Sequence, residues 1–424
     1  MNDLLEKDAS WIWHPFTPLV GGPKPIVIKS ASGIYLQTDD GRNIIDAVSS
    51  WWVNLHGHSH PEIVKALTDQ ITSLDHVIFA GFTHEPAIAL AENLLKILPS
   101  NQSRIFFSDN GSTAVEVALK MALQFWANQR VEKKKIVAID GAYHGDTFGS
   151  MSVGARGIFT DPFKDQLFDV EFITFPTATN EDLVMAQFSE LARTNNIAAF
   201  IFEPLVQGAA GMRMYSPAVL DQLLNVAKAY DIVCIADEVF TGFGRTGRLF
   251  ASDYLHNMPD IISLSKGITG GTMPLGVTSC SKQIAKAFQS EDIIKTFFHG
   301  HSYTANPLAC AVANASFKLL IGPECQQQIV LITRMHEAFE EKLKNHPRLR
   351  DIRCLGTILA LELEIEGESS YTDSVRKKIY DFFLERNVLL RPLGNTIYVL
   401  PPYVITATEL QNVYGYIEEF LNKK

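Results

Sequence analysis

The chain has 424 residues, of which 46% are apolar, 20% charged and 10% aromatic, a composition that provides for a large packed core. Its 37 Lys and Arg residues against 47 Asp and Glu residues give a net charge of −10, which repels a polyanion and disfavours nucleic acid as a partner. No apolar run is long enough to span a membrane, and the first residues lack the basic and apolar segments of a secretory signal. The five cysteines are odd in number and form no C-x-x-C pair, which favours a reducing, cytoplasmic location over a disulfide framework.

The predicted elements change in kind along the chain. Residues 25–46 are predicted to form antiparallel strands with a hairpin turn at 38–42. The middle alternates short apolar strands with amphipathic helices, and the helix at 113–130 has the clearest apolar spacing. Several strands are continuous apolar runs, which is typical of strands covered on both faces in a parallel sheet. The predicted strands are 104–108, 135–140, 197–203, 231–238, 261–264 and 275–279.

Beyond residue 322 the pattern is helix, strand, helix, strand, helix, with strands at 357–364, 388–391 and 396–400. We therefore predict an α/β fold with a large domain at 50–321 that contains a mostly parallel sheet. A smaller α+β domain is predicted from both ends of the chain, 1–49 and 322–424.

The strand at 104–108 is followed by Asp109, Asn110, Gly111, Ser112 and Thr113, and then by a helix. Glycine lets the backbone approach a ligand, the hydroxyls donate hydrogen bonds, and the helix N-terminus offers free N–H groups. Together these features suit a phosphate group. An ordinary N-cap turn is the alternative interpretation.

Asp237 and Glu238 end a predicted buried strand, and a glycine-rich loop follows at 241–247. A carboxylate at the C-terminal end of a parallel strand lies where such sheets bind ligands, with a structural ion pair as the alternative. Lys266 follows the next strand, 29 residues after Asp237, which leaves room for one crossover between neighbouring parallel strands. Small neighbours leave space at its amine, and burial would lower its pKa, as a Schiff-base lysine requires; a solvated turn lysine is the alternative.

These three motifs together match the needs of pyridoxal 5'-phosphate. The lysine would hold the aldehyde, the carboxylate would keep the pyridine nitrogen protonated, and the helix end would bind the phosphate. The combination is more specific than any of its parts.

The strings at 237–247 and 265–267 resemble those of class III pyridoxal-phosphate-dependent aminotransferases, and the resemblance covers nearly the whole chain. It implies the aspartate aminotransferase-like fold, fold type I of pyridoxal-phosphate-dependent transferases. It also implies a homodimer with active sites at the subunit interface.

The resemblance implies a role for each matching residue. Lys266 would hold the cofactor and move a proton, Asp237 would pair with the pyridine nitrogen, and Tyr143 would stack on the ring. The remaining cofactor contacts would come from Gly111, Ser112 and Val239 and, across the dimer interface, from Ser302. The substrate would be bordered by Trp51, Tyr143, Lys266, Gly300 and Tyr398, and Arg391 would bind a substrate carboxylate through two parallel bonds.

Other segments narrow the resemblance to class III members that convert 8-amino-7-oxononanoate to 7,8-diaminononanoate in biotin biosynthesis, with S-adenosyl-L-methionine as amino donor. These segments are 12–17, 49–52, 141–148, 208–215, 306–310 and 391–403. A class III enzyme for an ω-amino acid or a diamine is the alternative, because its cofactor contacts would be identical. Phe16 stands where the family often has Tyr, which leaves the amino donor open, and His301 replaces a family Pro and receives no role.

The histidines of 56–60 raise the alternative of a metal-binding or non-catalytic protein, because alternate residues of a strand share one face. Gly57 and Pro61 indicate a loop instead, and no Cys or carboxylate lies at a useful spacing, so no metal site is predicted. Trp51 and Trp52 are expected on an extended segment with their side chains on opposite faces, so that at most one faces a ligand.

Overall fold

The computed structural model describes residues 2–365 and 374–423, and a seven-stranded sheet lies at its centre. The strand order is β4-β12-β11-β10-β7-β5-β6. The neighbours from β11 to β6 pair in parallel, whereas β12 is antiparallel to both β11 and β4. The prediction of a mostly parallel sheet is therefore confirmed. The strands are β4 (Gln102–Ser108), β5 (Lys135–Ile139), β6 (Glu171–Ile173), β7 (Ile197–Phe202), β10 (Val233–Asp237), β11 (Ile261–Leu264) and β12 (Gly276–Ser281).

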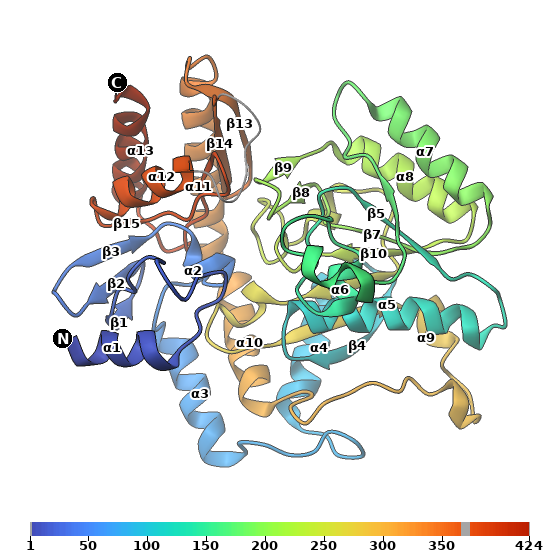
Figure 1. The fold of residues 1–424 in the computed structure, drawn as a ribbon. Helices are drawn as coiled ribbons and strands as arrows, with labels where there is room; N and C mark the ends of the chain where they lie inside the picture. Colours follow the sequence, from blue (N-terminus) through green and yellow to red (C-terminus); the bar gives the residue numbers. More distant parts are fainter. Residues whose placement is uncertain (1, 366–373, 424) are drawn as a thin grey trace.

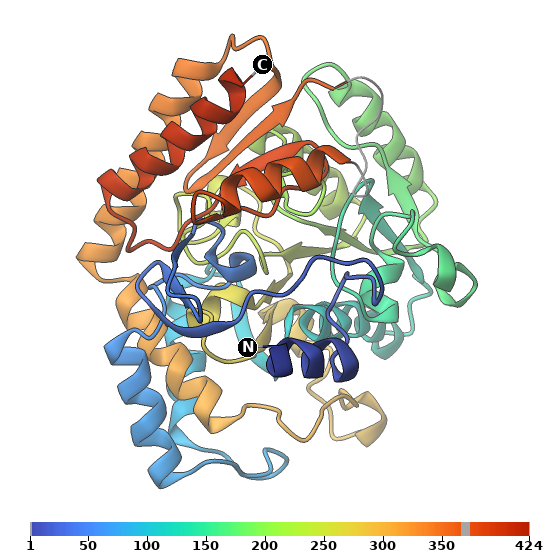
Figure 2. The same ribbon diagram turned by 60° about the vertical axis from the view of Figure 1, so that its left-hand side comes forward.

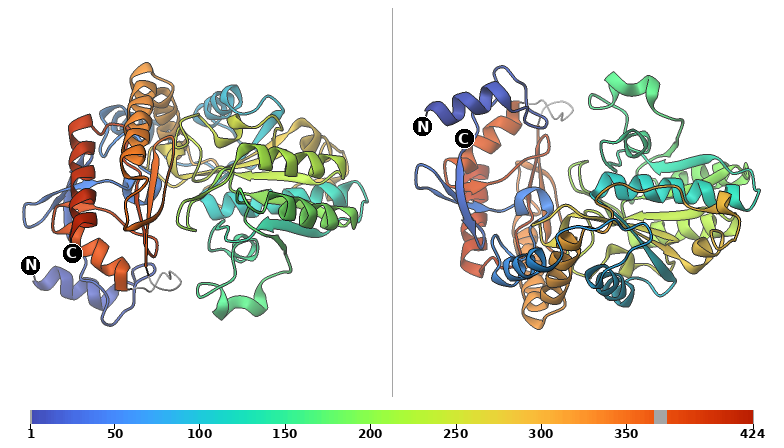
Figure 3. Two further views of the ribbon diagram at one scale, coloured as in Figure 1. Left: turned by 90° about the horizontal axis from the view of Figure 1, so that it is seen from above. Right: turned by 90° about the horizontal axis from the view of Figure 1, so that it is seen from below.

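Helices cover both faces of this sheet (Figures 1 and 3). Alternate residues of the central strands point to opposite sides, so Ala199 and Ile201 belong to one buried cluster and Phe200 and Phe202 to the other. The first cluster includes the apolar side of α5 (Gly111–Asn128), close to the predicted 113–130. The second includes α7 (Glu181–Arg193) and α8 (Pro217–Ala229). The continuous apolar strands are thus explained by burial on both sides.

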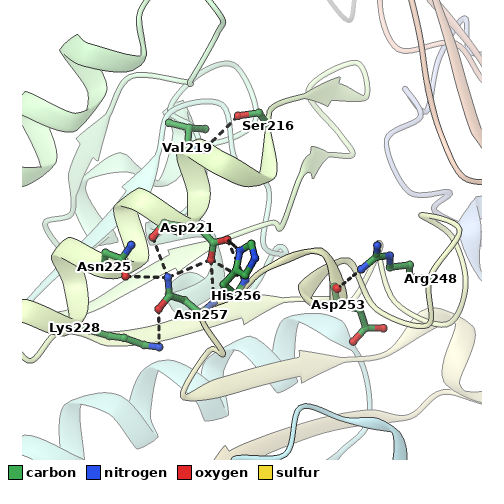
Figure 4. Close-up of polar contacts among 9 residues, drawn as sticks. All are labelled: Ser216, Val219, Asp221, Asn225, Lys228, Arg248, Asp253, His256 and Asn257. Atoms are coloured by element: carbon green, nitrogen blue, oxygen red, sulfur yellow. Dashed lines mark hydrogen bonds and ion pairs between the residues drawn. The ribbon is translucent and has the colours of Figure 1, made fainter.

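The connection from β10 to β11 is tied to α8 by one carboxylate (Figure 4). Asp221 accepts hydrogen bonds from the backbone N–H groups of His256 and Asn257, at distances of 2.9–3.0 Å. The Asn257 side chain also donates to the backbone carbonyl of Asp221 and to Asn225. These contacts fix the chain shortly before β11 begins, and β11 leads directly to Lys266.

The two ends of the chain lie side by side (Figures 1 and 2). Strands β1 (Ile28–Ser32), β2 (Tyr35–Thr38) and β3 (Asn43–Asp46) are antiparallel, as predicted, with the turn between β2 and β3. The C-terminal β15 (Val388–Leu389) pairs in parallel with β3 and so joins the two ends in one sheet. A second sheet has the order β13-β14-β16. The domain boundaries at 50 and 321 stay a prediction.

Four strands were not predicted from the sequence: β6, β8 (Val206–Gln207), β9 (Arg213–Met214) and β13 (Leu349–Leu355). β6 has three residues, too few for a pattern, and the charged residues of β13 interrupt its apolar run.

The other elements of the C-terminal part are α11 (Pro323–Leu343), β14 (Ile358–Leu363), α12 (Ser374–Leu384), β16 (Thr396–Val399) and α13 (Ala407–Asn422). The remaining elements are α1 (Asn2–Trp11), α2 (Ser49–Trp52), α3 (Pro61–Ser73), α4 (Glu85–Ile97), α6 (Phe148–Ser152), η1 (Asp161–Gln166), β8 (Val206–Gln207), β9 (Arg213–Met214), η2 (Ala251–Tyr254), η3 (Lys266–Thr269), α9 (Lys282–Lys286), η4 (Ile293–Lys295) and α10 (Pro307–Leu320). Among the described helices, none has the length and apolar character that a membrane span needs.

Candidate active site

A cavity of about 220 Å³ opens where β10 and β11 end and α5 begins. Open α/β sheets bind their ligands at this edge, outside the carboxyl ends of the strands. The lining residues are Trp52, Asn110, Gly111, Ser112, Tyr143, His144, Gly145, Glu203, Asp237, Val239, Phe240 and Lys266. We call the part around Lys266, Asp237, His144 and Gly111 the inner end. The neighbouring group of Trp51, Phe16 and Arg391 is called the outer end.

Lys266 is the first residue of η3, directly after Ser265 and the end of β11. Its Nζ lies 4.7 Å from the centre of the Trp52 ring and 5.7 Å from that of Phe240. Burial lowers the pKa of this amine, while the negative charges of Asp237 and Glu203 act in the opposite direction. A lysine with a lowered pKa is more often neutral, which is the nucleophilic form that attacks an aldehyde.

Asp237 is the last residue of β10 and is almost completely buried. One of its carboxylate oxygens lies 2.7 Å from Nδ1 of the buried His144. The other accepts the backbone N–H of Val239 at 3.0 Å. The opposite ring nitrogen of His144 has no partner within the described ranges. His144 therefore orients the carboxylate of Asp237. No local sequence pattern predicted this contact.

Glu238, the neighbour of Asp237, points away from the cavity. Its carboxylate accepts hydrogen bonds from the hydroxyls of Thr241 and Ser252 and from the backbone N–H groups of Ala251 and Ser252. Burial raises the pKa of Glu238 to about 7, even though these bonds favour the charged form. Of the two adjacent carboxylates, Glu238 holds the glycine-rich loop and Asp237 faces the cavity.

The N-terminus of α5 forms one wall of the inner end. Asn110 caps the helix by accepting the N–H of Thr113 at 3.0 Å. The N–H groups of Gly111 and Ser112 have no partner in the described part of the chain, and they carry the positive end of the helix dipole. A Cβ at Gly111 would lie 2.7 Å from Val239, and one at Gly145 would lie 2.1 Å from the Ser112 hydroxyl. Glycine at both positions keeps the start of α5 open, and a helix start of this kind is suited to an anion.

Tyr143 and Glu203 border the same cavity. The Tyr143 hydroxyl donates to Asp146 at 2.9 Å, and burial raises its pKa well above the usual range. Glu203 accepts the N–H groups of Tyr143 and Gly208 at 3.0 and 2.9 Å. Burial raises the pKa of Glu203 to about 7. Glu203 was not predicted as a site residue, since a single acid at the end of an apolar strand has no distinctive signal in the sequence.

The segment Ser49–Trp52 is a left-handed turn, so the expected extended segment is wrong. All four residues have positive φ, between 45° and 75°. Such a conformation costs about 1–2 kcal/mol for each residue other than glycine. The turn places Trp52 in the cavity beside Lys266, and leaves Trp51 38% exposed at the outer end. Trp52, which was not predicted as a site residue, is therefore the nearer of the two to the lysine.

The outer end is aromatic and carries one cation. The Arg391 guanidinium lies 4.4 Å from the centre of the Trp51 ring, within the range of a cation–π contact. Phe16 packs edge-on against Trp51 at 5.7 Å. Tyr398 is buried behind this group, and its hydroxyl accepts the Trp52 Nε1–H at 3.1 Å.

Gly300 and Ser302 are not brought to the cavity within this chain. They lie in the loop before α10, where His301 accepts the N–H of Tyr303 at 3.1 Å. Tyr303 packs on His76, with ring centres 5.4 Å apart. This local hydrogen bond is the role that the structure gives to His301.

The histidines of 56–60 each contact protein groups. His56 contacts the hydroxyl of Ser316, His58 contacts Asp46, and His60 caps α3. Among the described residues, no three potential metal-ligating side chains are grouped.

The residues of the inner end fit a phosphorylated aldehyde such as pyridoxal phosphate. Two free N–H groups and a hydroxyl lie at the start of α5, a carboxylate lies at the end of β10, and an amine with a lowered pKa lies at the end of β11. The fold and this donor set define a pyridoxal-phosphate-dependent transferase of fold type I.

Comparison with known proteins gives the family. Residues 20–421 match the family Aminotransferase class-III, so the chain belongs to the class III aminotransferases, which depend on pyridoxal phosphate. It is 48% identical over 420 residues to the adenosylmethionine-8-amino-7-oxononanoate aminotransferase of Synechococcus elongatus, covering 97% of this chain and 98% of that one. The crystal structure of the enzyme with the same name from Methanocaldococcus jannaschii superimposes with a TM-score of 0.94 and 32% identity, covering 99% and 98%. An omega transaminase from Pseudomonas jessenii superimposes with a TM-score of 0.92 and 26% identity, covering 99% and 97%.

Proposed function

We propose that this protein transfers an amino group to 8-amino-7-oxononanoate, forming 7,8-diaminononanoate in biotin biosynthesis, with S-adenosyl-L-methionine as donor. The observation that carries the proposal is the 48% identity along almost the whole chain to a relative named for this reaction. The cavity with Lys266, Asp237 and the free end of α5 supports it, because transamination needs these groups in one place.

We assign the cofactor contacts to residues of the inner end. Gly111 and Ser112 would bind the phosphate through their N–H groups, with Ser302 of a second subunit as a further donor. Asp237, oriented by His144, would accept a hydrogen bond from the pyridine nitrogen, and Tyr143 and Val239 would pack on the ring. When bound, pyridoxal phosphate supplies an aldehyde and a ring that takes up electrons from the substrate's reacting carbon.

Lys266 has two roles in this proposal. Its amine would hold the cofactor between turnovers, and once released by the incoming amine it would carry a proton to and from the substrate carbon. Both roles need an amine that is neutral part of the time, which the lowered pKa supports. Trp52 and Phe240 beside the amine would keep water away from it.

We assign substrate binding to the outer end. The keto substrate has an apolar chain that ends in a carboxylate, and Arg391 can bind that carboxylate through two parallel bonds. Trp51 and Tyr398 would line the chain's path, together with Gly300 of a second subunit. The aromatic group of Phe16 and Trp51 suits the adenine ring and the positive sulfonium of the donor, since aromatic faces bind both.

We further propose a cytoplasmic homodimer. Large apolar side chains stand exposed on neighbouring loops, which is typical of a subunit interface. They are Ile78, Phe82, Ile293, Ile294, Phe298 and Tyr303. Ser302 lies among them and could thereby reach the partner's phosphate site. The five free cysteines support a reducing compartment.

The decisive experiment is an assay with the amino acceptor held fixed. The purified protein should produce 7,8-diaminononanoate from 8-amino-7-oxononanoate and S-adenosyl-L-methionine, and a donor screen should rank the latter above lysine. Ornithine, 4-aminobutyrate and putrescine, each supplied with 2-oxoglutarate as a separate amino acceptor, serve as the comparison set. Faster turnover with one of these compounds, and none with the keto acid, would make the protein a different class III transaminase.

A further inference from the structure

The left-handed turn Ser49–Trp52 is the most strained segment that borders the cavity. Four successive residues other than glycine have positive φ. Strain of this kind persists only where surrounding contacts hold it, and it concentrates at functional sites. The contacts that hold this turn therefore bear on where Trp51 and Trp52 lie.

The entry to the turn is held by a buried carboxylate. Asp46, the last residue of β3, is 0% exposed. Its oxygens accept the Ser50 N–H at 2.9 Å and the Ser50 hydroxyl at 2.7 Å. Both bonds exist only while Ser50 stays in the turned conformation.

His58 completes this arrangement. Its Nε2 lies 2.9 Å from the carboxylate of Asp46. Its Nδ1 lies 3.1 Å from the Asn54 amide nitrogen, which donates to it, so Nε2 carries the proton and donates to Asp46. The same residue is bonded through its backbone to Gly33, which fixes the position of the ring. We call Asp46 and His58 the clamp.

The exit of the turn is held separately. The buried guanidinium of Arg245 donates to the carbonyls of Trp52 and Asn54 at 3.4 and 3.2 Å. Arg245 belongs to the glycine-rich loop at 241–247, so this loop also contacts the turn. Arg245 thus holds the backbone carbonyls at the end of the turn, whereas the clamp holds the N–H and the hydroxyl of Ser50.

We propose that Asp46 and His58 are positioning residues for substrate binding, acting by holding the turn that places Trp52 beside Lys266 and Trp51 beside Arg391. The inference rests on the proposed function only in naming the substrate. Without the clamp, the turn relaxes towards ordinary backbone conformations, and the two tryptophans leave their places beside Lys266 and Arg391. The amine of Lys266 and the carboxylate of Asp237 stay, because other elements hold them.

The test uses the full-length enzyme with bound cofactor and four variants. His58→Phe keeps a ring but removes the donor to Asp46, whereas His58→Gln retains an N–H that can reach it. Ser50→Ala removes only the hydroxyl contact with Asp46, and keeps the proposal testable if His58→Phe does not fold. His60→Asn is the matched control, because His60 lies two residues away, caps α3 and does not contact the turn.

Two measurements are made on each variant. Hydrogen exchange of the backbone N–H groups of 48–54 reports on the turn without any substrate, and steady-state kinetics separate KM from kcat. In His58→Phe we expect faster exchange and a KM for the keto substrate raised roughly tenfold, with kcat changed less than about threefold. Ser50→Ala and His58→Gln should follow with smaller effects, and His60→Asn should match the parent protein in both measurements.

Unchanged exchange in His58→Phe and Ser50→Ala would overturn the clamp, whatever substrate the enzyme uses. Faster exchange with an unchanged KM would overturn its link to substrate binding. Failure of the proposed function appears differently, as no turnover of the keto substrate by the parent protein. In that case the exchange result and the KM for whichever substrate the assay identifies still decide the inference.

Discussion

The inner end of the cavity and the neighbouring outer end are built in different ways. At the inner end, Lys266 and Asp237 stand at the ends of neighbouring parallel strands, and His144 holds the carboxylate from a fully buried position. At the outer end, Trp51 and Arg391 come from opposite ends of the chain and remain partly open to solvent. The buried inner end suits its proposed role in bond chemistry, because bond making and breaking need groups in fixed positions. The more exposed outer end suits its proposed role in substrate binding, which tolerates side chains that adjust.

Removal of the amine should have the largest effect, and it should act on the inner end alone. In Lys266→Ala we expect transamination to fall by at least about a thousandfold, because no other amine lies within the lining of the cavity to replace it. The visible absorbance that borohydride bleaches in the parent protein should also disappear. Lys286→Ala, an exposed lysine on α9, is the control and should leave both unchanged. Bleaching that persists in Lys266→Ala would place the covalent link on another residue.

The next largest effect is expected from the carboxylate. Asp237→Asn should lower kcat by roughly a hundredfold or more while changing KM little, because an amide cannot keep a ring nitrogen protonated. His144→Phe should show a smaller loss of the same kind, since it leaves the carboxylate in place but free to turn. Steady-state kinetics and the cofactor absorbance spectrum of both variants give the comparison. If His144→Phe reduced kcat more than Asp237→Asn, His144 would act directly on the reaction.

Substitutions at the outer end should change KM rather than kcat. Arg391→Ala is expected to raise KM for 8-amino-7-oxononanoate by roughly ten- to a hundredfold with little change in kcat, because a charge-assisted contact of about 1.5–3 kcal/mol is lost. Arg391→Lys should recover only part of the affinity, since an ammonium group cannot form two parallel bonds. Arg334→Ala, an exposed arginine on α11, is the control. An unchanged KM in Arg391→Ala would refute the assignment of the carboxylate site.

The site residues that could be predicted from the sequence are those that follow a recognisable strand, and the others depend on contacts between distant parts of the chain. Lys266 and Asp237 were identifiable because each follows a recognisable apolar strand, and the parallel topology then places strand ends together. His144 is 93 residues from Asp237, and Glu203 reaches the cavity from a third strand, so no local pattern links them. The left-handed turn was predicted as extended, because its conformation depends on contacts with Asp46 and Arg245 rather than on its own residue types. Gly300 and Ser302 do not line the cavity of this chain, so their roles at the site of a partner subunit stay predictions.

Burial shifts the titration of a group inside the cavity and of a group outside it in opposite directions. Glu203 at the inner end has its pKa raised from 4.5 to about 7, so its contribution to stability is complete below pH 4.5 and is lost as pH rises through 7. His56, which contacts Ser316 of α10 outside the cavity, has its pKa lowered from 6.5 to about 3. Burial is the main cause, and the nearby His60 adds to it. The contribution of His56 is complete above pH 6.5 and is lost as pH falls towards 3.

The smallest predicted effect follows from the lowered pKa of His56. Replacing the buried ring in His56→Gln removes the proton uptake that accompanies unfolding, so the variant should gain stability relative to the parent protein as pH falls from 6.5 to 4.5. The relative gain is bounded by about 1.4 kcal/mol for each pH unit, which corresponds to a few degrees in Tm. Thermal unfolding of both proteins at a series of pH values measures it, with His346→Gln as a control at a half-buried histidine in a turn before β13. A Tm difference that stays constant across this range would show that His56 takes up its proton as readily in the folded as in the unfolded protein, so that burial does not exclude the charge.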